Sequence, residues 1–298
     1  MIKTIDPKKV SVAAFHSHML GAIAPRPIAF VSSMDSAGQV NLSPFSFFNA
    51  FGSNPPVVVF SPSRRVRDNT TKHTLENVRE VPEVVINIVN YAMVQQMSLA
   101  STEYEKGINE FVKAGLTEAR SVAVRPPRVE EAPVAFECKV IDVVSIGEEG
   151  GAANLVICEI LLAHVDEAIL NEEGEIAPAK LDTVARMGGD WYCRASGDAL
   201  FKVKKPVKTK GLGIDQLPKN VRLSVVLTGN DLGKLGNVEA LPEEGAVQDY
   251  ATRPEIKEML VRFQNDRESL VFHFHEHARE LLKEDKVEEA WLVLSQIE

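Results

Sequence analysis

Three short apolar runs decide the fold: Arg26-Pro-Ile-Ala-Phe-Val-Ser-Ser33, Asn41-Leu-Ser-Pro-Phe-Ser-Phe-Phe-Asn49 and Pro55-Pro-Val-Val-Val-Phe-Ser61. Each run ends in hydroxyl or amide side chains, as buried β-strands do where they reach solvent. A cationic segment, Arg64-Arg65-Val66-Arg67, follows at once, although the chain has a net charge of −9. Polar strand ends beside arginines suit a phosphate that carries an aromatic ring system. The stretch therefore predicts a site for a nucleotide-like cofactor.

The composition narrows the class of protein. With 33 Lys and Arg against 42 Asp and Glu, the chain lacks the positive balance that nucleic acid requires, so no nucleic-acid partner is expected. No apolar run approaches the ~20 residues of a bilayer span, and the N-terminus shows no signal core, so we expect no membrane and a cytoplasmic location. The three cysteines (Cys138, Cys158 and Cys193) have no metal-site or disulfide spacing and indicate reduced thiols.

The pattern of short strands indicates a mainly β fold. Strands are expected at 28–33, 41–49, 57–60, 84–89, 134–146 and 154–166, with a hairpin turn at 34–40. Short helices are expected at 71–79, begun by Thr70 or Thr71, and at 91–100 and 105–114, the last ending at Gly115. Irregular strands with inserted helices favour a closed or partly closed β-barrel. The chain has no Gly-x-Gly-x-x-Gly, which removes the simplest dinucleotide fold.

The chain changes character near residue 204. A segment rich in Lys, Pro and Gly at 204–211 predicts a linker, so residues 1–205 form one expected domain and 206–298 a mostly helical extension. Helices are expected at 254–264, 266–283 and 286–297. His273 and His277 share a helix face, as a zinc pair would, but no third ligand can be named, so a charged helix is preferred and no metal is assigned.

The cofactor FMN needs cations and hydroxyls for its phosphate, an apolar slot for its ring, and hydrogen bonds for its pyrimidine edge. The sequence offers candidates for each. Arg64, Arg65, Lys72 and Thr74 suit the phosphate; Pro44, Phe45, Phe47 and Phe48 suit the slot; Ser32, Ser33, Asn41, Ser43, Ser46 and Asn49 suit the polar edge. Because alternate strand residues face opposite sides, some of the phenylalanines are expected in the core, and backbone atoms are expected at the ring. His16 and His18 are weaker candidates for the rim.

The same segments resemble the flavin reductase-like family of FMN-binding split β-barrels, which includes flavoredoxin. The three opening runs, Lys72-His-Thr-Leu-Glu-Asn-Val, Glu110-Phe-Val-Lys-Ala-Gly-Leu-Thr and Arg186-Met-Gly-Gly-Asp-Trp-Tyr match its segments in the right order. The resemblance covers roughly residues 10 to 200. His73 stands where the family usually has Asp, and the extension lies outside the match.

The resemblance implies a homodimer with one FMN per subunit near the interface, and hydride transfer from NADH or NADPH to the flavin N5. No catalytic acid–base residue is expected, because the cofactor supplies the chemistry. The residues assigned to the cofactor are Arg26, Pro27, Ser32, Ser33, Asn41, Ser43, Pro44, Ser46, Phe47, Asn49, Ser61, Ser63, Arg64, Lys72 and Thr74.

Two other functions stay open. An FMN-binding electron carrier, flavoredoxin-like and reduced by a protein partner, would use the extension to dock that partner or cover the ring. A cofactor-free interaction protein would stay colourless when FMN is added. The choice between NADH and NADPH and the electron acceptor are not decided by the sequence.

Overall fold

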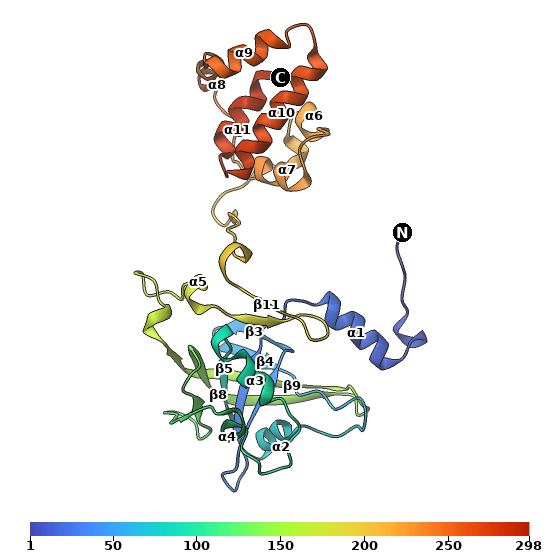
Figure 1. Cartoon of the computed structure of the whole chain (residues 1–298), viewed down its shortest axis with the longest axis vertical. Helices are drawn as coiled ribbons and strands as arrows, with labels where there is room; N and C mark the ends of the chain where they lie inside the picture. The colour runs from blue at the N-terminus through green and yellow to red at the C-terminus, as the bar shows by residue number, and fades with distance from the viewer. Residues whose placement is uncertain (298) are drawn as a thin grey trace. The chain divides into compact units, whose positions relative to one another are not determined.

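The chain folds into two compact units (Figure 1), Met1–Phe201 and a second unit that begins at Lys202. This computed structural model describes residues 1–297. The division falls a few residues before the sequence-based boundary at 205/206. Each unit has its own hydrophobic core, and each is described separately below.

The first unit is built around one antiparallel sheet of seven strands in the order β2-β1-β5-β8-β9-β4-β3. The two edge strands, β2 and β3, are consecutive in the chain and only Ser46 and Phe47 separate them. The sheet therefore curls back on itself, which gives a split β-barrel. The strands are β1 (Ala29–Met34), β2 (Val40–Phe45), β3 (Phe48–Ser53), β4 (Pro56–Phe60), β5 (Glu83–Ile88), β8 (Val134–Ile146) and β9 (Ala153–Val165).

The longest element of the sheet is the hairpin of β8 and β9, whose register runs from Val134 opposite Val165 to Ile146 opposite Ala153. Two irregularities interrupt it, after Glu137 and after Val140. Such bulges bend a strand and increase its twist, which a closing sheet requires. Two small sheets complete the unit: β6 (Glu118–Ala119) with β7 (Arg128–Val129), and β10 (Val184–Arg186) with β11 (Tyr192–Arg194).

Successive residues of β1 face different cores. Ala29 and Val31 belong to the barrel interior, together with Leu75 and Val78 of α2 (His73–Glu80). Phe30 faces the other way, into a second cluster that includes Phe111 of α4 (Glu110–Ala114). Helix α2 therefore packs its apolar side onto the barrel and holds its first turn beside the ends of β1 and β2.

The helices of this unit are short. Lys72 is the N-cap of α2, in place of the expected Thr70 or Thr71. The helix expected at 105–114 begins only at Glu110 but ends as predicted, with Gly115 in the left-handed conformation. The remaining helices are α1 (Val12–Ala22), α3 (Val94–Leu99) and α5 (Pro178–Leu181), with 3₁₀ turns at Pro7–Lys9, Tyr91–Met93, Glu167–Ile169 and Gly197–Ala199.

The second unit is helical. The buried Trp291 lies at its centre and donates its indole N–H to the Leu235 carbonyl at 3.1 Å. A capping box of Thr228 and Asp231 begins α7. The helices are α6 (Lys219–Arg222), α7 (Gly229–Gly236), α8 (Glu244–Ala251), α9 (Pro254–Arg262), α10 (Arg267–Lys283) and α11 (Val287–Leu294), with 3₁₀ turns at Ile214–Gln216 and Ser295–Ile297.

Candidate flavin site

Two buried side-chain hydrogen bonds join the start of α2 to the strand ends. Asn41 Nδ2 on β2 donates to Thr74 Oγ1 at 2.9 Å, and Asn77 Nδ2 donates to Ser33 Oγ on β1 at 3.1 Å. All four side chains are buried. Ser33 and Asn41 are directly opposite each other in the strand register, so their side chains leave the sheet on the same face. The sequence predicted Ser33, Asn41 and Thr74 as site residues, and the structure brings them together.

The cationic segment follows β4 as a loop that reaches Lys72. Arg64 stabilises this loop internally, because its guanidinium donates to Asn69 Oδ1 at 2.5 Å and to the Asn69 carbonyl at 2.6 Å. Asn69 adopts a positive φ of 57°, a conformation that asparagine tolerates in tight turns. Arg64 therefore has a structural role in the loop beside any role at a ligand.

Three cations from this loop gather around one carboxylate, Glu103. Arg65 Nε donates to Glu103 Oε1 at 2.8 Å, Arg67 donates to Oε2, and Lys72 Nζ lies 3.6 Å from Oε1. Burial lowers the pKa of the Lys72 ammonium and the neighbouring Arg65 lowers it further, whereas Glu103 acts in the opposite direction. One carboxylate thus only partly balances the positive charge of the cluster.

The first residues of α2 add backbone donors beside these cations. Lys72, the N-cap, makes no side-chain capping bond, and its carbonyl accepts from Leu75 N–H at 2.9 Å. Within the described residues 1–297, the His73 and Thr74 N–H groups have no hydrogen-bond acceptor. Free N–H groups at a helix start favour an anion, and here they supplement the charged side chains.

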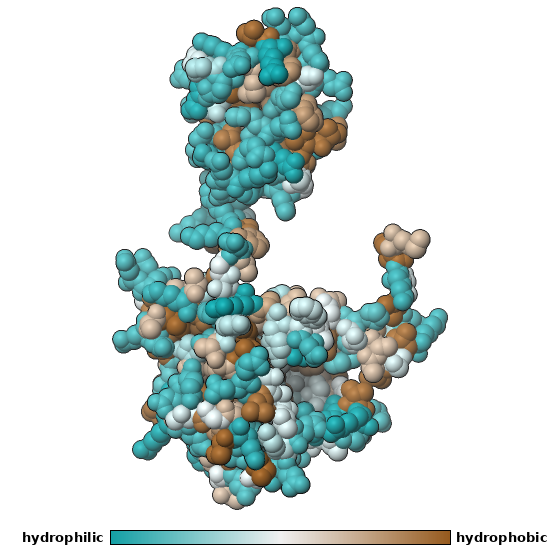
Figure 2. Space-filling model, in the orientation of Figure 1, coloured by the Kyte–Doolittle hydropathy of each residue, from teal (hydrophilic) through white to brown (hydrophobic). Residues whose placement is uncertain are grey.

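The loop also reaches the turn between β2 and β3. Ser61 N–H donates to the Phe47 carbonyl at 2.9 Å, and Ser61 Oγ lies 3.5 Å from Ser63 Oγ. The Phe47 ring meets His16 of α1 edge to face, with 6.1 Å between the ring centroids. Figure 2 shows a recess in the surface between α1 and the barrel. The loop that carries the cations and the His16–Phe47 ring pair therefore both adjoin the turn between β2 and β3.

Arg26 contacts the C-terminal end of α1. Its guanidinium donates to the Leu20 and Ile23 carbonyls and, at 2.6 Å, to the Met187 carbonyl; its Nε lies 3.5 Å from Ser46 Oγ. The side chain is buried, so these partners occupy its donors. Arg26 holds the end of α1 to the loop after β10, and its predicted contact with the cofactor gains no support from this geometry.

In the loop after β10, the structure gives a reason for a glycine at position 188, the first of the pair Gly188-Gly189. A Cβ added at Gly188 would lie 3.3 Å from the Cα of Gly21 in α1. The backbone that approaches Gly188 closely is therefore that of the chain's own helix.

The remaining predicted residues lie at separate positions, some buried and some exposed. Ser32 points away from the Ser33 face, and within residues 1–297 its buried Oγ lacks a hydrogen-bond partner. Asn49 and Pro27 are exposed, and Asn49 Oδ1 accepts from the Ala50 N–H. Ser43 and Pro44 are half-buried on opposite faces of β2. Their cofactor roles stay predictions.

Two participants were not found from the sequence, Glu103 and Asn77. Glu103 lies 31 or more positions from its three cationic partners, so no local pattern indicates it. Asn77 belongs to the quoted Lys72–Val78 motif, but its partner Ser33 is 44 positions away.

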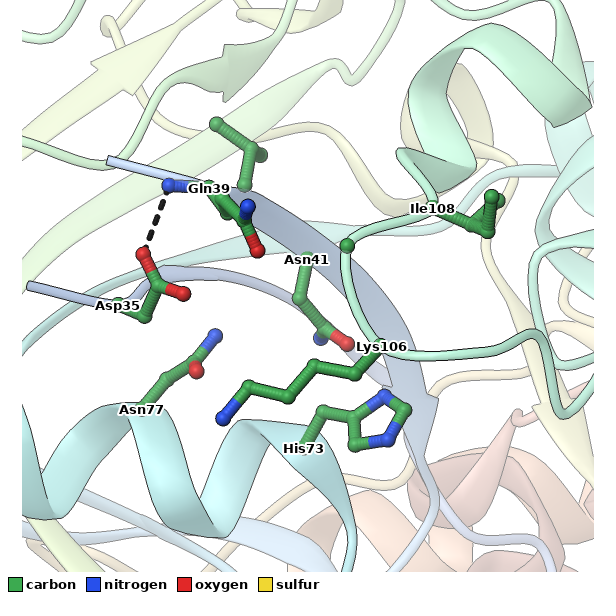
Figure 3. A pocket seen from close by; sticks show the side chains of 9 residues that line it. Asp35, Gln39, Asn41, His73, Asn77, Lys106 and Ile108 are labelled. Carbon is green, nitrogen blue, oxygen red and sulfur yellow. Dashed lines mark hydrogen bonds between the residues drawn. The ribbon is translucent and has the colours of Figure 1, made fainter. Parts of the chain in front are cut away.

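A small pocket lies beside this cluster (Figure 3), between the turn after β1, the start of α2 and the loop at 106–108. Gln39 N–H donates to Asp35 Oδ1 at 2.8 Å, and the Lys106 side chain extends over His73 towards Asn77. Its internal volume of about 10 Å³ holds about one water molecule. It is therefore too small for a flavin ring.

Two further observations concern metal binding and membrane-spanning helices. Within residues 1–297, no group of three or more His, Cys, Asp or Glu side chains is arranged to hold a metal ion. In the same residues, no helix combines the length and apolar character that crossing a bilayer requires. The site offers cations, hydroxyls, amides and an aromatic wall, which fit a phosphate attached to a ring.

Comparisons with known proteins show to which family the chain belongs. The model of the flavin reductase like domain matches residues 20–180. A protein of Aquifex aeolicus is 38% identical over 185 residues, which are 62% of this chain and 92% of that protein. The chain therefore belongs to the flavin reductase-like family, and its class is that of flavin-related oxidoreductases.

Solved structures show the same fold. Nitrilotriacetate monooxygenase component B from Bacillus cereus has a TM-score of 0.64 and 28% identity, covering 68% of this chain and 99% of that one. A protein with a split barrel domain from Shewanella frigidimarina has a TM-score of 0.57 and 26% identity, over 66% of this chain and 95% of that one. The predicted family and the split-barrel fold class are confirmed.

Proposed function

We propose that this chain binds FMN at the pole formed by residues 61–74 and the ends of β1 and β2, and that it is an NAD(P)H-dependent flavin reductase. The observation that carries the proposal is the gathering of Arg65, Arg67 and Lys72 beside buried hydroxyl and amide groups. A phosphate monoester carries about −1.5 to −2 charges, which suits this cluster. Family membership supports a flavin as the attached ring system.

The residues have separate roles in this proposal. Lys72 and Arg65 bind the phosphate, and the Ser61 and Ser63 hydroxyls complete its hydrogen bonds. Phe47 and backbone atoms of the β2–β3 turn line the ring and exclude water from one face. Bound FMN would supply hydride acceptance at its N5 from the nicotinamide C4 of NADH or NADPH. The chain has to orient both rings, which needs no general base.

The direct test is the spectrum of the purified protein followed by anaerobic titration with NADH and with NADPH. We expect bound flavin absorption that bleaches with at least one of the two donors. Flavin that stays oxidised with both would refute the reductase. A protein that binds neither FMN nor riboflavin would refute the flavin site itself.

Lys72→Met tests the phosphate position. Because the change removes one charge opposite the phosphate, FMN affinity should fall about tenfold, while riboflavin, which lacks the phosphate, should bind unchanged. Lys106→Met is the matched control, since Lys106 lies nearby but pairs with Glu76 at 3.5 Å. Fluorescence quenching of each flavin gives the dissociation constants.

The second candidate is an FMN electron carrier that a protein partner reduces. The observation that favours it is the separate helical unit after Lys202, which lies outside the matched residues 20–180. A carrier would hold FMN yet bleach only slowly with either nicotinamide, and this outcome of the anaerobic titration separates the two candidates.

We also propose a homodimer that works in the cytoplasm. Helix α1 has no buried residue although most of its side chains are apolar, and Phe51 and Trp191 are exposed. A second copy would cover such surfaces. The unpaired cysteines support a reducing compartment. Light scattering should give twice the chain mass of 32.8 kDa; the mass of one chain would contradict the dimer.

A further inference from the structure

Glu103 occupies the place where the proposed phosphate cations converge. Its two carboxylate oxygens contact Arg65, Arg67 and Lys72. These three cations come from one short loop, whereas Glu103 comes from a separate segment between α3 and α4. Glu103 is thus the one carboxylate that contacts all three cations among the described residues 1–297.

The charges around Glu103 do not balance. Arg67 also pairs with Asp68 at 3.1 Å, so two carboxylates face three cations. Arg65 is the least exposed partner, with 15% of its side chain accessible, against 36% for Glu103. A surplus of positive charge on partly buried groups attracts a further anion. The cluster is therefore expected to attract a phosphate even while Glu103 contacts the cations.

The Glu103 side chain can also rotate away from the three cations. It lies in the irregular segment between Leu99 and Glu110, so a rotation of its side chain breaks no helix or strand hydrogen bond. The ion pair with Arg67, whose side chain is 69% exposed, contributes only about 0.2–1 kcal/mol, which a doubly charged phosphate can replace. Arg65 retains hydrogen bonds to Thr70 Oγ1 and the Thr71 carbonyl, so its position does not depend on Glu103 alone.

We propose that Glu103 is an internal competitor of the FMN phosphate, which sets how tightly the chain holds FMN and how readily FMN exchanges. The inference rests on the proposed flavin site and deepens it. The carboxylate keeps the cations together in the free chain and moves to solvent when the phosphate arrives. Binding then includes the loss of these ion pairs, so FMN is held more weakly than the cations alone would hold it.

The test compares FMN and riboflavin binding by the full chain, Glu103→Gln and Glu105→Gln. Glu105 is the matched control, because it lies in the same segment and within residues 1–297 makes no ion pair. We expect Glu103→Gln to bind FMN about tenfold more tightly, with riboflavin unchanged and the control within about twofold of the parent chain. The gain should shrink as salt is raised.

Several results would overturn the proposal, and they are distinguishable. Equal or weaker FMN binding by Glu103→Gln, in a variant with an unchanged circular dichroism spectrum, means that Glu103 positions the cations. Equal affinity of the parent chain for FMN and riboflavin means that this cluster does not hold the phosphate, although flavin binding stands. A parent chain that binds neither flavin refutes the proposed function.

Discussion

At the scale of single residues, Arg26 shows how a buried cation can join two separate segments of the chain. Arg26 is 4% exposed, and its guanidinium donates to the carbonyls of Leu20, Ile23 and Met187. Burial lowers its pKa and the nearby Arg186 lowers it further, so the hydrogen bonds must offset the loss of hydration. The side chain thus links the end of α1 to the loop after β10, beside the backbone hydrogen bonds between Arg26 and Arg186.

Arg26→Met should therefore lower the free energy of unfolding by about 3 kcal/mol, because it leaves three carbonyls without donors. Urea unfolding followed by circular dichroism measures the change. Arg125→Met is the control, since its ion pair with Glu83 is exposed and should matter by less than about 1 kcal/mol. A variant that keeps its stability but loses FMN would instead support the predicted cofactor role of Arg26.

His275 on α10 is a buried histidine whose protonation the fold opposes. Ser224 Oγ accepts the N–H groups of Val226 and Leu227, so its hydroxyl proton is free to donate to His275 Nδ1 at 2.8 Å. Within residues 1–297, Nε2 is buried without a partner. Burial lowers the pKa of His275 below its ordinary 6.5.

The helical unit should consequently lose stability in mild acid. Below about pH 6.5 the unfolded chain binds more protons at this histidine than the folded unit does, so the stabilisation is complete above that pH and falls towards the lower folded pKa. The loss should be at most about 1.4 kcal/mol per pH unit. Emission of the buried Trp291 in a Trp191→Phe chain reports it. His275→Gln should flatten the profile, and a profile that keeps its shape in this variant would contradict the assignment to His275.

At the scale of elements, the sequence predicted those strands and helices whose buried side chains recur with a regular period. The hairpin expected at 134–146 and 154–166 forms at Val134–Ile146 and Ala153–Val165, because its apolar residues alternate. β3 was not separated from the expected strand 41–49. After Phe48 its residues are all exposed at the edge of the sheet, so burial leaves no signal there. The start of α4 was missed because Gly107, with a positive φ of 88°, belongs to a loop.

In the candidate site, too, local sequence patterns indicated single residues but not the contacts between distant segments. Ser33 and Asn41 lie near strand ends, and Lys72 and Thr74 lie at the start of a helix, which are local properties that the sequence pattern indicates. Their hydrogen bonds and the contact of Lys72 with Glu103 join segments 31 to 44 positions apart. Such contacts depend on how the sheet closes, which local periodicity does not specify.

The end of α4 can be tested with a single methyl group. Gly115→Ala should destabilise the chain by about 1 kcal/mol, because the residue has a φ of 63° while no neighbouring atom would meet the new Cβ. Gly21→Ala is the control: it also has free space but lies in α1, where alanine should stabilise by about 0.5–1 kcal/mol. Urea unfolding should give opposite signs; equal signs would show that the backbone conformation does not decide the effect.

At the scale of the whole molecule, the two units differ in what they contribute. Every residue to which we assign a flavin contact lies before Lys202. The second unit buries its own core around Trp291, Phe274 and Leu235. The family match ends at residue 180 and leaves this unit without an assigned role. Flavin binding and the work of the helical unit are therefore separable questions.

A chain shortened to residues 1–201 should fold and bind FMN within about twofold of the full chain, because the cations, the hydroxyls and Phe47 are all retained. If the helical unit covers the flavin or docks a partner, the shortened chain should be reduced faster by free NADH or NADPH under anaerobic stopped flow. An unchanged rate would assign that unit to stability or assembly. Loss of FMN from a shortened chain with an intact circular dichroism spectrum would contradict the placement of the whole site in the barrel, because some group beyond residue 201 would then have to hold the cofactor.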